Sequence, residues 1–120
     1  DADLLQKLNG IIHPAVMRKF SEFERESKAK LIIKETALLF EANLQSTCQK
    51  IIVVAADDAL RLERVMQRDA LREEDVLKKM NAQWPQEKKI EKADFVILNN
   101  EDSLLIPRVL EIYEHLNSVA

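Results

Sequence analysis

The sequence is poor in glycine and cysteine, and each shortage excludes a class of site. Only one of the 120 residues is glycine, Gly10, whereas an average usage of roughly 7% predicts about eight. The Walker A phosphate loop needs two glycines at fixed spacing and the dinucleotide fingerprint needs three, so these 120 residues hold neither. The single cysteine, Cys48, excludes an internal disulfide and a cysteine-based zinc site.

Long apolar runs and an excess of one charge are also missing. The longest strictly apolar run, residues 51–56, is far shorter than the ~20 residues of a membrane-spanning helix. The 18 basic and 21 acidic residues give a formal net charge of -3, so we expect neither nucleic acid nor a membrane as a partner. The acidic start, residues 1–3, has no signal-peptide pattern, and we therefore expect a cytoplasmic protein.

The sequence does contain an alternation of apolar runs and amphipathic segments. Hydrophobic residues make up 47% and charged residues 32% of the chain, which is typical of a globular domain. Three runs are apolar at every position, which predicts strands buried on both faces: residues 31–33, 51–55 and 95–98. Their alternation with helical patterns predicts an α/β fold with a parallel sheet.

The helical patterns have recognisable starts and apolar faces. Pro14 fits the start of a first helix, and Asp57 or Asp58 fits the N-cap of a second helix that runs to about Asp69. The charged stretch 85–92 predicts a short turn. Two further helices are expected around that turn, and their apolar residues are Val76, Leu77 and Met80, then Leu105, Val109, Ile112, Leu116 and Val119.

Three arginines mark one side of the second helix. At 100° per residue, Arg61, Arg64 and Arg68 fall within an arc of about 60°. The opposite face holds the apolar residues Ala59, Leu62 and Met66. A guanidinium is permanently charged and matches phosphate oxygens in two-pronged geometry, so this face could bind a polyphosphate. The alternative is a solvated helix face with ion pairs to nearby acids, which many amphipathic helices carry.

Several other polar residues admit two interpretations. His13, before Pro14, could be a ligand or general base, or could simply bond a nearby carbonyl. Glu35 and Glu41 follow apolar segments, where acids often face a ligand crevice but also terminate strands. Asn99-Asn100 ends the third apolar run, and asparagine there also suits a turn.

Five segments, in this order, resemble the dephospho-coenzyme A kinase family. No single motif is decisive, but together they span nearly the whole chain. Residues 8–14 resemble that family's L-N-x-I-x-H-P segment, and Leu38-Leu39-Phe40-Glu41 resembles its P-L-L-F-E. The others are residues 62–69 (L-x-R-x-x-x-R-D), Ala82-Gln83 with Glu87-Lys88 (A-Q-x-x-x-E-x-K/R) and residues 93–99 (A-D-x-V-I-x-N).

The resemblance implies a fold, a reaction and a set of site residues. The fold is the layered α/β fold of the P-loop nucleoside-monophosphate kinases. The reaction transfers the γ-phosphate of ATP, with Mg²⁺, to the ribose 3′-hydroxyl of dephospho-coenzyme A, the final step of coenzyme A biosynthesis. By the same resemblance Arg64 and Arg68 would lie over the ATP phosphates and Asn99 beside the adenine. We expect the acceptor dephospho-coenzyme A to meet His13, Glu35 and Glu41.

The family's Gly-rich phosphate loop and catalytic aspartate have no counterpart in these 120 residues. We therefore expect a single, incomplete kinase domain without a catalytic residue or metal ligand, and a chain that is inactive alone. Its expected parts are a helical acceptor-binding part at about 1–28, a core at about 29–68 and 93–120, and a lid at about 69–92.

The strand that leads into the family's phosphate loop would lie mid-sheet, between residues 31–33 and 51–55. Without it the neighbouring strands would expose unpaired edges. Three outcomes are open: the two strands pair directly, another chain fills the gap in a homo-oligomer formed through those edges, or the missing strand belongs to a part of the protein outside these 120 residues. Two alternatives stay open at this point. One is another small-molecule kinase of the same fold, and the other is a non-catalytic helical interaction module that dimerises through the last helix.

Overall fold

The computed structural model describes residues 2–119, which form two compact units, one ending at Lys34 and one from Glu35 to Val119. Within the first unit, the side chains at positions 2, 5, 6, 9 and 13 are outside the description. The predicted role of His13 therefore lies outside the described residues.

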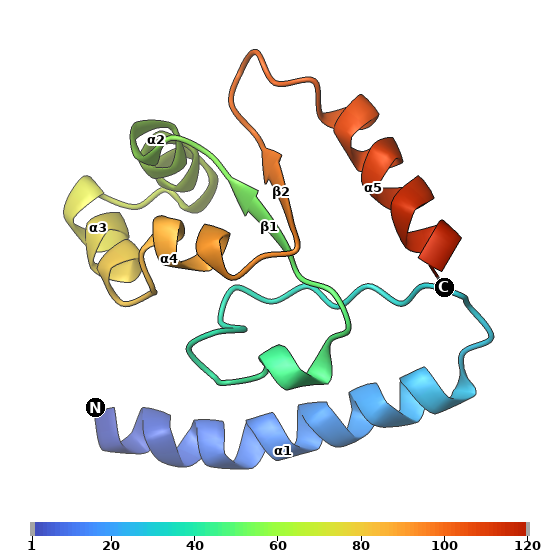
Figure 1. Ribbon diagram of the computed structural model, residues 1–120. Helices are drawn as coiled ribbons and strands as arrows, with labels where there is room; N and C mark the ends of the chain where they lie inside the picture. The colour runs from blue at the N-terminus through green and yellow to red at the C-terminus, as the bar shows by residue number, and fades with distance from the viewer. Residues whose placement is uncertain (1, 120) are drawn as a thin grey trace. The chain divides into compact units, whose positions relative to one another are not determined.

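The first unit is built on one long helix, α1 (Ala2–Glu26), which contains Pro14 in its interior (Figure 1). The prediction that a helix starts at Pro14 is therefore wrong. Residues 4–8 are leucine, lysine and glutamine, strong helix formers that favour helix ahead of the proline. The proline removes only one backbone donor, and the segment after it carries the helix on to Glu26.

Residues 31–33 form no strand, so this prediction is also wrong. A strand needs a hydrogen-bonded neighbour, and no backbone hydrogen bond among the described residues joins this run to another segment. The adjacent Lys34 packs back on α1 instead. Its Nζ lies 3.4 Å from Met17 Sδ and 4.7 Å from the centroid of the Phe20 ring.

The second unit contains two parallel strands, β1 (Ile52–Ala55) and β2 (Phe95–Leu98), side by side in Figure 1. They confirm two of the three predicted strands. The expectation of burial on both faces is wrong in part, because Val54 and Leu98 are 61% and 57% exposed. In β1 the exposed positions alternate, at Ile52 and Val54, because successive side chains point to opposite faces. In β2 only Leu98, at the carboxyl end, is exposed.

Four helices complete the second unit: α2 (Asp58–Asp69), α3 (Glu73–Asn81), α4 (Gln86–Glu91) and α5 (Leu105–Val119), with a 3₁₀ turn at Gln45–Thr47. The predicted helices after β1 and β2 are confirmed. The turn predicted at 85–92 is wrong, because α4 occupies it. Pro85 stands at the N-cap, and the glutamine, glutamate and lysines after it are good helix formers.

The buried hydrophobic residues of this unit come from the segment before β1, from the two strands and the residue after β1, and from α3 and α5. They are Phe40, Ala55, Ala56, Val76, Ile97 and Ile112. The Phe40 ring also stacks on the Trp84 ring, with 5.7 Å between centroids. This stack joins the segment before β1 to the chain between α3 and α4.

One backbone acceptor on the outer edge of β2 is bound by a side chain. Phe95 and Asn99 donate their N–H groups to carbonyls of the β1 segment, so the alternate residue Val96 directs its carbonyl away from β1. Arg108 of α5 donates from Nε to that carbonyl at 3.1 Å and pairs with Glu111 at 2.7 Å. The outer edge of β2 thus has one acceptor already occupied.

Candidate functional site

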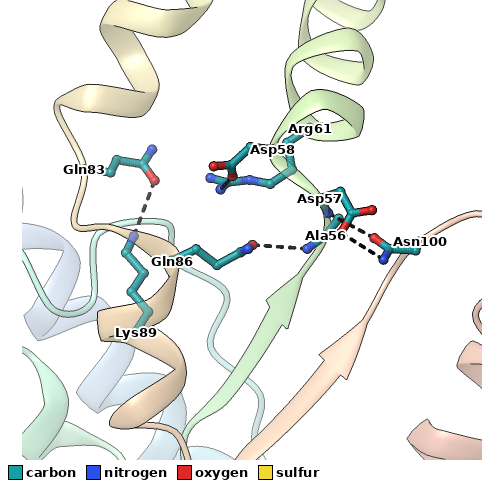
Figure 2. Close-up of polar contacts among 8 residues, drawn as sticks. All are labelled: Ala56, Asp57, Asp58, Arg61, Gln83, Gln86, Lys89 and Asn100. Atoms are coloured by element: carbon teal, nitrogen blue, oxygen red, sulfur yellow. Dashed lines mark hydrogen bonds and ion pairs between the residues drawn. The ribbon is translucent and has the colours of Figure 1, made fainter.

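The carboxyl ends of β1 and β2 lie side by side, and polar contacts join the residues around them (Figure 2). We call this group the polar corner; it consists of Ala56, Asp57, Gln86 and Asn100. Directly after β1, the Ala56 N–H donates to Gln86 Oε1 at 3.1 Å. The next N–H, of Asp57, donates to Asn100 Oδ1 at 3.0 Å. Gln86 belongs to α4 and Asn100 follows β2. Two successive amides are therefore held by carboxamides from two different elements.

A second hydrogen bond makes the contact between Asn100 and Asp57 reciprocal. Asn100 Nδ2 donates to Asp57 Oδ1 at 3.2 Å. Asp57 is the N-cap residue of α2, yet its side chain makes no capping hydrogen bond to that helix. The Asn100 N–H donates to Ser103 Oγ and the Ser103 N–H to the Asn100 carbonyl, both at 3.1 Å. Asn100 thus closes the turn after β2 and holds the start of α2.

Each of the three arginines on α2 has a protein partner. Arg64 Nη1 donates to the Asn99 carbonyl at 2.7 Å. Arg61 Nη1 lies 2.8 Å from Asp58 Oδ1, and its side chain is 31% exposed. On the opposite face Leu62 and Met66 are half-buried, whereas Ala59, which was assigned to that apolar face, is exposed.

Arg68 forms a two-pronged pair with the adjacent Asp69. Its Nε and Nη2 lie 2.7 and 3.1 Å from the two carboxylate oxygens. These hydrogen bonds and the guanidinium charge lower the pKa of Asp69, and the same pairing raises the pKa of Arg68. The Arg68 side chain is 73% exposed, so the pair sits in solvent and remains accessible to a ligand.

A second cluster surrounds Glu41. Its Oε1 accepts hydrogen bonds from the Trp84 N–H at 2.7 Å and from Lys89 Nζ at 2.9 Å, and both charged side chains are about 15% exposed. Lys89 also donates to the Ala37 carbonyl and to Gln83 Oε1. Desolvation would raise the pKa of Glu41, but the hydrogen bonds from Lys89 and Trp84 and the lysine charge together lower it.

The structure brings together two of the predicted site residues, Arg64 and Asn99. Glu41 lies in the separate cluster with Lys89, and Glu35 is exposed in the same unit. Sequence reasoning missed Lys89 and Gln86. The match at 82–88 pointed to this segment, but no spacing in the sequence indicates that these side chains reach Glu41 and the end of β1.

The described residues contain neither a metal-binding cluster nor a membrane-spanning helix. No group of three or more histidine, cysteine, aspartate or glutamate side chains in that part of the chain is arranged to hold a metal ion. We therefore assign no metal ligand here. The described helices include none with the length and apolar character that crossing a membrane requires.

Comparisons with known proteins identify relatives of the chain. A dephospho-CoA kinase from Chlorobaculum tepidum is 41% identical over 124 residues, which cover 99% of this chain and 59% of that protein. A dephospho-CoA kinase from Fusobacterium nucleatum is 41% identical over 98 residues, which cover 82% of this chain and 51% of that protein. The chain thus spans about half the length of the curated relatives it matches.

A solved structure and a family match agree with these relatives. The crystal structure of TT1252 from Thermus thermophilus is similar with a TM-score of 0.87 and 32% sequence identity, over 96% of this chain and 60% of that one. This similarity confirms the predicted α/β fold of the P-loop kinase type. The family described as CoaE, dephospho-CoA kinase, matches residues 1–104. The chain therefore belongs to the dephospho-CoA kinase family.

Proposed function

We propose that the complete protein transfers the γ-phosphate of ATP to the ribose 3′-hydroxyl of dephospho-CoA. The observation that carries this proposal is the family match over residues 1–104. That match weighs against a non-catalytic helical module. A kinase of the same fold with another acceptor is the remaining competitor, and the acceptor segment around His13 and Pro14 is where the two would differ.

The arginines of α2 supply charge for this reaction. Phosphoryl transfer depends chiefly on positioning and on neutralising the charge of the transferring group. Arg64 uses Nη1 on the Asn99 carbonyl, which leaves its other guanidinium donors for ATP phosphates. Arg68 would bind the phosphates either while it remains paired with Asp69 or after the phosphates have displaced the Asp69 carboxylate. Asn99, held by Arg64, would lie beside the adenine.

The acceptor side would be formed by His13, Glu35 and Glu41. Glu35 is exposed, so its carboxylate is accessible to dephospho-CoA. Glu41 forms an ion pair with Lys89 and accepts a hydrogen bond from the Trp84 N–H. We infer that Glu41 acts on the acceptor site indirectly, because its hydrogen bond with the Trp84 N–H fixes the chain between α3 and α4. The neighbouring Phe40 supports the same segment by stacking on the Trp84 ring.

Mg²⁺ would enter with ATP and lower the charge of the triphosphate, and we assign no ligand for it in this chain. The division into an acceptor-binding part at about 1–28 and a lid at about 69–92 is part of the same proposal. A cytoplasmic location, expected from the acidic start of the sequence, belongs to the same proposal. The expectation of no nucleic acid or membrane partner also belongs to it and rests on the near-balanced charge of -3.

The direct test is product identity with the complete protein. We expect ATP, Mg²⁺ and dephospho-CoA to give ADP and a product with one added phosphate, located on the 3′-hydroxyl by fragmentation mass spectrometry. Coenzyme A, whose 3′ position is already phosphorylated, is the matched control and should give no product. Phosphorylation of a different acceptor with dephospho-CoA left unmodified would contradict the proposal and favour the same-fold alternative.

A further inference from the structure

We propose that Asn100 is a positioning residue for nucleotide binding. Its side chain sets the start of α2 against the loop after β2, so that Arg64 and Asn99 meet ATP in a fixed relation. The inference rests on the proposed function for its ligand. It assigns a role to a residue outside the five segments that resemble the family.

Three hydrogen bonds tie the two segments together. Two of them join Asn100 and Asp57, at 3.0 and 3.2 Å, and the third joins Arg64 to the Asn99 carbonyl at 2.7 Å. A fourth bond, from the Ala56 N–H to Gln86, holds the same corner from α4 (Figure 2). Asn100 is the only described side chain that both donates to and accepts from this corner.

The side chain of Asp57 bonds Asn100 and does not cap its own helix. An aspartate at an N-cap normally accepts a hydrogen bond from an N–H of its own helix and stabilises it. Asp57 makes no such bond, and its Oδ1 accepts from Asn100 instead. The pairing therefore replaces a local stabilising contact with one that joins segments 43 residues apart.

The consequence for ATP follows from where the two segments lead. α2 carries Arg64 about two turns beyond Asp57, and Asn99 immediately precedes Asn100. If the corner opens, the arginine and the asparagine move relative to each other. A misplacement of about 1 Å in a site of this kind can reduce activity by roughly a hundredfold.

The decisive experiment exchanges the two partners in the complete protein. Asn100→Asp sets a second carboxylate against Asp57 and should weaken ATP binding about ten- to a hundredfold, within the usual range of coupling between two sites. Asp57→Asn alone should change it little, because the new carboxamide can turn its oxygen toward Asn100 Nδ2. The double variant Asp57→Asn/Asn100→Asp again pairs an amide with a carboxylate and should recover ATP affinity to within about threefold of wild type.

Two more variants separate positioning from general damage. Asn100→Ala removes both hydrogen bonds without adding charge, and should weaken ATP binding less than Asn100→Asp does. Gln67→Glu is the matched control, because Gln67 donates to Glu63 at 3.0 Å on the exposed surface of the same helix. It also creates a pair of facing carboxylates, yet ATP affinity should stay unchanged. Calorimetric Kd for ATP, KM for dephospho-CoA and a thermal melt are measured for each protein.

We expect the Kd for ATP to change while the KM for dephospho-CoA does not. Wild-type ATP affinity in Asn100→Asp, or no recovery in a folded double variant, would overturn the inference and leave the proposed function intact. If wild type binds ATP and the rescue succeeds but dephospho-CoA is not phosphorylated, the acceptor assignment fails and the role of Asn100 stands. A wild-type protein that does not bind ATP overturns both.

Discussion

Arg64 donates a 2.7 Å hydrogen bond to the main-chain carbonyl of Asn99, a residue 35 positions further along the chain. The family resemblance implies, through two separate motifs, that each residue lies near ATP, and the structure shows the two residues in contact. The bond orders the arginine before any ligand arrives, which reduces the conformational entropy lost on binding. Arg68 pairs with its neighbour Asp69 and has no such link to the β2 segment among the described contacts.

In the complete protein, Arg64→Ala and Arg68→Ala should reduce kcat far more than they reduce stability. Both side chains are exposed, and exposed substitutions usually change the free energy of unfolding by about 0.5 kcal/mol or less. Arg64→Ala also removes one hydrogen bond, worth about 1 kcal/mol. An arginine on a transferring phosphoryl group can contribute as much as 10³–10⁵ in rate, with arginine fingers as the upper reference.

Arg61→Ala is the control for these variants, because Arg61 shares the face but pairs with Asp58 and lies outside the L-x-R-x-x-x-R-D match. The measurements are kcat at saturating ATP and a thermal melt for each variant. Near-normal turnover in all three would mean that the arginines form an ordinary solvated helix face.

The 120-residue chain by itself should show no kinase turnover. With one glycine it cannot form the loop whose backbone N–H groups and lysine hold the β- and γ-phosphates. A coupled assay of ADP release with dephospho-CoA and Mg²⁺ checks this. Turnover near the ordinary kinase range of about 1–100 per second would show that another segment of the chain binds the phosphates.

Lys89→Ala should destabilise the complete protein by about 1–3 kcal/mol, the scale of hydrogen bonds to charged groups. The substitution leaves the largely covered Glu41 carboxylate with the Trp84 N–H alone, and Glu41 Oε2 is already buried without a hydrogen-bond partner among the described residues. Lys88→Ala is the neighbouring control, since Lys88 is exposed and only lies over the Trp84 ring. Equal denaturant midpoints for the two variants would exclude a structural role for the Glu41–Lys89 pair.

Asp94 should contribute stability that depends on pH. Hydrogen bonds from Lys50 Nζ and from the Ile51 N–H, at 2.8 and 2.9 Å, lower its pKa. A lowered carboxylate pKa stabilises the fold above the unfolded-state value of about 3.9, and this contribution is lost as pH falls through the folded-state value. Melts of wild type and Asp94→Asn should differ most near neutral pH and converge in acid. A constant difference at all pH values would contradict this assignment.

The isolated chain should self-associate. Ile52 and Val54 on β1 are 39% and 61% exposed, and β1 has no second neighbouring strand among the described residues. Such an edge offers unpaired backbone groups to another chain. Light scattering over a concentration series measures the effect. A strictly monomeric species that melts cooperatively would show that β1 is satisfied within one chain.

The sequence identified those parts of the fold that depend on local pattern. The β-branched run at 51–55 and the run at 95–98 became β1 and β2, and the apolar spacing after them became α2, α3 and α5. The run at 31–33 has the same local pattern but no strand, because strand formation depends on a neighbour that local pattern does not reveal. Two other predictions were wrong because the surrounding residues are good helix formers. Pro14 does not start the first helix but lies inside it, and the charged stretch 85–92 contains the helix α4 where a turn was predicted.

Of the polar sites, the sequence could identify side chains but not their partners. Glu41 was singled out by the segment that ends in it, whereas Lys89 shows its role only through a contact across 48 residues (41 to 89). One interpretation of Asn100 from the sequence was a turn residue, and Asn100 does close a turn with Ser103. Its pairing with Asp57 depends on the parallel register of β1 and β2, which brings both strand ends to one place.

The hydrogen bond from Arg108 to the outer carbonyl of Val96 makes the two sides of the sheet unequal. A chain with one open and one blocked strand edge can pair edge to edge with only one other copy. Such pairing closes as a two-fold symmetric dimer, whereas two open edges would permit an unlimited fibre. In the isolated chain the Arg108 side chain occupies one outer acceptor of β2, so we expect edge-to-edge association to use β1 and to favour a pair of chains over a fibre.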